Sequence, residues 1–148
     1  MAPSPTEGPP ALRREVRDLL LVAAGAVPGA LLRWRLEDLG KGLVGGHAGL
    51  IESDLVANML GTFLIGVIAA QPAPRPRLML LGGIGFCGSL TTFSSWMLQI
   101  SLALRRGRPD EALAVVLISL LGGLVAVSVG LVLGRWLGRW LGHGRLRR

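Results

Sequence analysis

The stretch LMLLGGIGFCGSLTTFSSWMLQISLAL, residues 78–104, decides how this chain folds. It contains no charged residue, and as one straight helix it would be about 40 Å long, against a hydrocarbon core of about 30 Å. Its centre is a poor helix former, because glycines, Ser89 and two adjacent threonines crowd together there. We therefore predict two half-helices joined by a break near Gly88–Thr92. The alternative is an unbroken, glycine-rich helix that packs tightly against its neighbours.

A break at this depth would have chemical consequences. Non-helical backbone inside a membrane is tolerated only within protein or along a water-filled cavity. The break frees backbone carbonyl groups and points two helix ends at the membrane midplane. Carbonyl ends suit a small cation, whereas amide ends suit an anion. The stretch therefore predicts an ion site.

Three more apolar stretches accompany it, over residues 18–36, 50–70 and 111–134. Each is about long enough to cross a bilayer. The composition agrees, with 51% hydrophobic residues, 22 glycines and no tyrosine. We predict an all-α membrane protein with four transmembrane helices. Its organisation is expected to be a disordered tail over residues 1–17, one four-helix domain over 18–142 and a basic tail over 143–148.

The formal net charge of +7 comes from 16 basic and 9 acidic residues. The basic residues lie almost entirely in tails and connections, which is the ordinary signal for membrane topology, so no nucleic-acid partner is expected. With four spans, both termini and the 71–77 connection share one side. That side carries ten basic residues and the other side six, a mild preference for cytoplasmic termini; the six are Arg33, Arg35, Lys41, Arg105, Arg106 and Arg108.

Polar residues follow one face of the second span at intervals of four, at Asp54, Asn58 and Thr62. A buried asparagine needs partners, and its amide can donate two hydrogen bonds. Asn58 therefore either binds an anion in a pore or makes a helix–helix hydrogen bond. No catalytic set and no metal-ligand spacing accompany it, which argues against an enzyme.

The first span has Gly25, Gly29 and Arg33 at the same interval. The two glycines form a small-xxx-small motif that favours close helix packing. Arg33, near the end of the span, either reaches the membrane interface or attracts anions to a pore vestibule.

These residues resemble the Fluc (CrcB) family of fluoride channels. The resemblance is carried by Gly25-x3-Gly29-x3-Arg33, by Asn58-x2-Gly61-x-Phe63-x2-Gly66, and by the string GFCGSLTTFSS over residues 85–95. It implies four transmembrane helices in a dual-topology antiparallel dimer, with two fluoride pores along the dimer interface. It also implies a structural sodium ion on the twofold axis, held by carbonyl groups of the third-helix break.

Individual roles follow from the resemblance by position. It implies that the backbone carbonyls of Gly88 and Thr91 bind the sodium ion, and that Asn58 and Phe93 line the fluoride pore. Trp96 stands where the family usually has a second pore phenylalanine, and it carries an N–H donor.

Further pore residues come from the same comparison and from the chemistry of fluoride. The resemblance places Arg33 at the vestibule and Ser119 as the pore serine of the fourth helix. Fluoride is strongly hydrated, so a pore must offer replacement donors, and the hydroxyls of Thr92 and Ser94 are expected to serve.

Three other positions depart from the family pattern. Asp54 replaces the usual threonine, Gln99 the usual glutamate, and Val115 a tyrosine. We predict a passive fluoride-selective channel of the cell membrane that exports fluoride, formed by a homodimer or by a heterodimer with a paralogous subunit. The alternatives are a half-pore or non-conducting subunit and, with less support, a small multidrug-type exporter, whose coupling glutamate in the first helix is missing.

Overall fold

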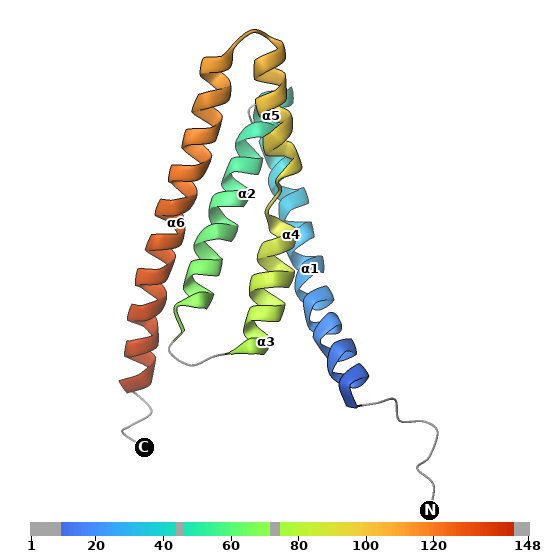
Figure 1. Cartoon of the computed structure of the whole chain (residues 1–148), viewed down its shortest axis with the longest axis vertical. Helices are drawn as coiled ribbons and strands as arrows, with labels where there is room; N and C mark the ends of the chain where they lie inside the picture. The colour runs from blue at the N-terminus through green and yellow to red at the C-terminus, as the bar shows by residue number, and fades with distance from the viewer. Residues whose placement is uncertain (1–9, 44–45, 72–74, 144–148) are drawn as a thin grey trace, which may run out of the picture.

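The computed structural model describes residues 10–43, 46–71 and 75–143, and every regular element in those ranges is a helix. The helices form rods that run alternately up and down (Figure 1). The third rod consists of four consecutive segments. The elements are α1 (Pro10–Leu43), α2 (Gly46–Ala69), α3 (Pro76–Leu78), the π-helix η1 (Met79–Cys87), α4 (Gly88–Leu90), α5 (Ser94–Arg105) and α6 (Pro109–His143).

Helix α1 is longer at both ends than the predicted span. It begins at Pro10, so residues 10–17 are helical and not part of a tail; residues 1–9 lie outside the described ranges. The reason is local, because proline suits the first helical turn and the following residues are mostly strong helix formers. Residues 37–43, which follow the predicted span, are helical too, and the Arg33–Glu37 ion pair of 3.5 Å links them to the span.

Within the described ranges, three helices are long and apolar enough to cross a membrane: Leu12–Leu43, Pro76–Arg105 and Pro109–Trp140. These helices confirm that the protein is all-helical and suited to cross a membrane more than once, as predicted. The second predicted span corresponds to Ser53–Ala69 within α2, which is apolar but shorter than the other three. The described part of the basic C-terminal tail is only His143, where α6 ends; residues 144–148 lie outside the described ranges.

Glycines allow the rods to approach closely. A methyl group on Gly25 would collide with the carbonyl oxygen of Leu81, and one on Gly29 with that of Phe86. The predicted close-packing role of this glycine pair is therefore confirmed, with η1 as the partner of α1. On the other side of the bundle, a methyl group on Gly134 of α6 would lie 2.6 Å from the carbonyl oxygen of Val67 in α2.

The direction of the rods agrees with the shared side that an even number of spans predicts for the two ends of the bundle. The start of α1, the end of α2, the start of α3 and the end of α6 all lie at the same end of the molecule (Figure 1). The turn between α5 and α6 lies at the opposite end, where Gly107 adopts a positive φ of 70°.

Candidate functional site

The third rod is interrupted between α4 and α5. Gly88 is still helical, whereas Thr91 is extended with φ −82° and ψ 153°. Helical geometry returns at Phe93, and α5 starts at Ser94. The structure thus has the predicted break, but at the C-terminal edge of the expected interval. Gly82, Gly83 and Gly85, which precede the break, lie in the π-helix η1.

Asn58 of α2 holds the break in place with two hydrogen bonds. Its Nδ2 donates to the carbonyl oxygen of Thr92 at 3.0 Å, and its Oδ1 accepts from the backbone N–H of Thr92 at 2.7 Å. Of the two alternatives considered for Asn58, the structure shows a hydrogen bond between segments, made to the backbone of the break, and anion binding by Asn58 stays a prediction. Because a primary amide has two N–H groups, the second one is left for another acceptor.

This arrangement releases carbonyl groups on the third rod. In a continuous helix the N–H of Thr92 would donate to the carbonyl of Gly88, and that of Ser95 to the carbonyl of Thr91. The first N–H donates to Asn58 instead, and no backbone hydrogen bond among the described residues crosses the break to either carbonyl. Gly88 is exposed, and a methyl group there would meet nothing within 4 Å. Neutral carbonyl oxygens of this kind fit a hard cation such as sodium.

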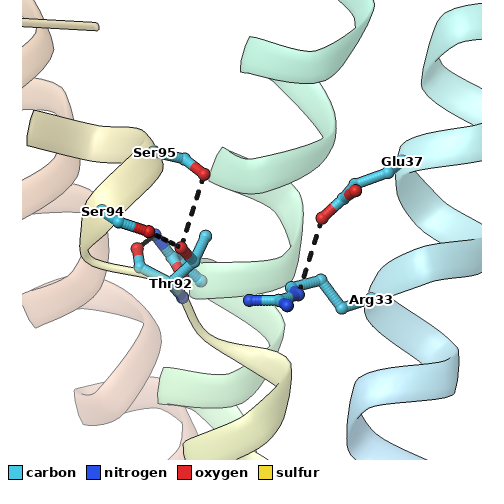
Figure 2. Close-up of polar contacts among 6 residues, drawn as sticks. Arg33, Glu37, Thr92, Ser94 and Ser95 are labelled. Atoms are coloured by element: carbon cyan, nitrogen blue, oxygen red, sulfur yellow. Dashed lines mark hydrogen bonds and ion pairs between the residues drawn. The ribbon is translucent and has the colours of Figure 1, made fainter. Parts of the chain in front are cut away.

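Hydroxyl groups gather where α5 begins. The Oγ1 of Thr92 lies 3.3 Å from the Oγ of Ser94 and 3.4 Å from that of Ser95 (Figure 2). Thr92 itself is buried, whereas Ser94 is exposed. Ser95 was not among the residues predicted for the site. Its position within the same threonine–serine string was the available signal.

A pocket of about 170 Å³ lies between α2, α5 and α6, and we call it the inter-helix pocket. It brings together three residues predicted for the pore, Asn58, Trp96 and Ser119. It also contains the three other positions that depart from the family pattern. The full lining is Asp54, Leu55, Asn58, Trp96, Gln99, Val115, Ile118 and Ser119.

Two buried polar atoms of the inter-helix pocket have no hydrogen-bond partner: Asp54 Oδ1 and Trp96 Nε1. One is an acceptor and the other a donor. Buried polar groups in native proteins almost always have partners, so such atoms indicate a place for water or a ligand. The sequence identifies Asp54 as a departure from the family pattern, but its unpartnered oxygen and its place in the same pocket as Trp96 follow only from the packing.

Phe93 and Arg33, both predicted for the pore, do not line the inter-helix pocket. The side chain of Phe93 points outward at 69% exposure, and its ring centroid lies 5.4 Å from that of Trp96. Arg33 pairs with Glu37 on α1 (Figure 2). Glu37 was not predicted, although its spacing of four residues from Arg33 is a known signal for an ion pair on a helix.

Fold and site together define a helical membrane protein of the ion-channel or transporter type, with a broken helix beside a pocket that contains a few polar side chains. The chain belongs to the CrcB family: the family model described as "CrcB-like protein, Camphor Resistance (CrcB)" matches residues 20–131. The resemblance found in the sequence is thereby confirmed. The family consists of fluoride channels, which are not enzymes.

Curated relatives carry names that agree. The chain is 48% identical to "Fluoride-specific ion channel FluC 2" of Parasynechococcus marenigrum (strain WH8102), over 80% of this chain and 82% of the relative. It is 37% identical to "Fluoride-specific ion channel FluC 2" of Prochlorococcus marinus (strain MIT 9313), over 80% and 83%. It is 42% identical to "Fluoride-specific ion channel FluC 1" of that same strain, over 74% and 86%. One strain therefore has two similar proteins with numbered names.

Proposed function

We propose that this protein is a passive, fluoride-selective channel of the cell membrane, through which fluoride leaves the cytoplasm. The observation that carries the proposal is the position of Asn58, which both holds the helix break and lines the inter-helix pocket. The names of the relatives supply the ion. In this proposal α2, which has 24 residues, also crosses the membrane, together with the three longer helices.

Hydrogen-bond donors would replace the water around fluoride along the route. Support for this comes from the second N–H of Asn58, the unpartnered Nε1 of Trp96 and the hydroxyl of Ser119, which all belong to one pocket. The hydroxyls of Thr92 and Ser94 continue the polar route at the start of α5. Phe93 would offer the electropositive edge of its ring, and Arg33 would draw anions to the entrance.

The same proposal includes a dimer with a structural sodium ion. The carbonyls of Gly88 and Thr91 are released by the break, and Gly88 lies at the surface of the single chain. A second, antiparallel chain would present the same two carbonyls, so that four neutral oxygens surround one cation. When bound, sodium would supply a positive charge that binds the two breaks together.

A half-pore subunit is the second candidate function. It is favoured by Asp54, because a buried carboxyl group in the pocket opposes anion entry. The presence of numbered relatives in one strain agrees with a heterodimer of two paralogous chains. In that case only the mixed pair would conduct.

Liposomes that contain the purified chain test the proposal, with a fluoride electrode as readout and chloride efflux as the ion control. We expect fluoride efflux without chloride efflux. Phe93→Ile should abolish the flux, because it removes an exposed ring that lies against Trp96. Leu124→Ala, on the exposed face of α6, serves as the matched control and should keep it. A chain without fluoride flux, alone and together with a paralogous subunit, would contradict the proposed function.

A further inference from the structure

The last residue before the break packs against a single glycine of α2. Gly61 is buried, and a methyl group there would lie 2.5 Å from the Cγ2 methyl of Thr91. The next atoms are the carbonyl oxygen of Cys87 at 3.6 Å and the Cδ2 of Leu90 at 3.8 Å. Because two carbon atoms in contact are about 3.5–4.0 Å apart, a side chain at residue 61 requires Thr91 to move by about 1 Å.

The side chain of Thr91 is held by hydrogen bonds. Its Oγ1 donates to the carbonyl oxygen of Cys87 at 3.0 Å, and its backbone N–H donates to the same oxygen at 3.1 Å. The hydroxyl and the methyl group are attached to the same Cβ, so a rotation that moves the methyl group away from Gly61 also takes the hydroxyl from Cys87. A methyl group on Gly61 would therefore displace Thr91 or break this bond.

Asn58, three residues before Gly61 on the same face of α2, fixes the next residue of the break. The N–H of Thr92 donates to Asn58 Oδ1 at 2.7 Å. This N–H and the carbonyl of Thr91 belong to one planar trans peptide group, in which N–H and C=O point in opposite directions. The carbonyl of Thr91 consequently points away from Asn58, and the two α2 residues hold its peptide group from either side.

We infer that Gly61 is a positioning residue for the proposed sodium site, because the space that it leaves for the Thr91 methyl group sets the direction of the Thr91 carbonyl. The inference rests on the proposed function. Groups that bind a ligand must be held within about 0.5 Å of the productive geometry. The shift of about 1 Å that a side chain at residue 61 requires exceeds this tolerance. An added methyl group therefore weakens sodium binding, although residue 61 does not contact the ion.

Thermal unfolding in detergent, over a series of sodium concentrations at constant ionic strength, tests the inference. The quantity compared is the sodium concentration that gives half of the sodium-induced rise in unfolding temperature. Gly61→Ala should raise it by about tenfold or more, because overpacking disturbs the site. Thr91→Ser removes the colliding methyl group and keeps the hydroxyl that bonds to Cys87. The double variant Gly61→Ala/Thr91→Ser should therefore need the same sodium concentration as Thr91→Ser alone, within about twofold.

Gly66→Ala is the matched control on the same helix. Its methyl group would also lie 2.5 Å from another atom, but this atom is the carbonyl oxygen of Val127 in α6 and not part of the third rod. Gly66→Ala should lower the unfolding temperature and keep the sodium response of the wild type, and Thr91→Ser should not restore its stability. A variant that is merely destabilised is thereby separated from one with a displaced carbonyl.

The possible results lead to different conclusions. A sodium response that Gly61→Ala leaves unchanged, or that Thr91→Ser does not restore, overturns the inference while the proposed dimer stands. If Gly61→Ala does not fold, a folded and sodium-responsive double variant supports the inference, and failure of both contradicts it. A wild type without any sodium response contradicts the proposed sodium site and the inference with it. The expected pattern in a chain without fluoride flux contradicts only the proposed channel.

Discussion

At the scale of single residues, Asn58 makes the hydrogen bonds of one alternative that the sequence presented, and the other alternative, anion binding, stays a prediction. Its amide bonds to both backbone groups of Thr92, and it borders the pocket in which an anion would bind. The position of the break and the shape of the pocket therefore depend on the same side chain. The hydroxyl of Thr62, one turn further along α2, donates a hydrogen bond to the carbonyl oxygen of Asn58 at 2.6 Å.

Asn58→Ala should consequently reduce both stability and fluoride flux. It leaves the N–H and the carbonyl of Thr92 without partners, which costs about 1–3 kcal/mol for each buried group. Thr62→Val is the matched control and should have a small effect. Thermal unfolding in detergent and fluoride efflux from liposomes are the measurements. Equal stability of the two variants would show that Asn58 does not hold the break.

At the scale of elements, close contact between α1 and η1 positions the third rod. The π-helix brings the backbone around Leu81 and Phe86 against Gly25 and Gly29, with no space for a side chain between them. Along this rod, η1 is followed by the short helix α4 and then by the extended Thr91. Tight packing before the break thus limits how far the break can shift.

Gly29→Ala should destabilise the protein by about 1–3 kcal/mol, because the added methyl group collides with backbone and not with a flexible side chain. Gly123→Ala in α6 is the matched control, since a methyl group there meets nothing within 4 Å. Alanine is the better helix former by about 1 kcal/mol, so this control should be neutral or slightly more stable. The midpoint of thermal unfolding in detergent compares the two. If both variants unfold at the same temperature, the contact between α1 and η1 is looser than described.

At the scale of the whole molecule, two residues of the predicted site lie at the surface of the single chain. Phe93 is 69% exposed and Gly88 is exposed, although both belong to the predicted site. This distribution is what a site shared between two copies requires, and it supports the proposed dimer.

If the proposed sodium-bound dimer forms, removal of sodium should weaken it. A cation that binds only the assembled pair stabilises it by about 2.7 kcal/mol at a concentration one hundred times its dissociation constant. We expect dialysis into N-methylglucamine buffer to lower the unfolding temperature and to increase the monomer fraction in light scattering, and sodium to reverse both changes. An assembly that is indifferent to sodium argues against the carbonyls of Gly88 and Thr91 as its ligands.

The sequence by itself determined the helical membrane class, the family and the presence of a break in the third rod. These features depend on local properties: the length of apolar runs, the density of glycine and a distinctive short string. It also indicated the close packing of Gly25 and Gly29. Local reading failed at the ends of α1, where strong helix formers extended the helix beyond the apolar span.

Only the tertiary structure decided where the break lies and what surrounds it. Thr92 takes its partner from Asn58, which is 34 residues away, so no local pattern could place the break at Thr91–Phe93. The isolation of Asp54 beside Trp96 likewise arises because α2, α5 and α6 meet there. The physical reason is the same in both cases: a buried polar group is defined by its partners, and these partners come from distant parts of the chain.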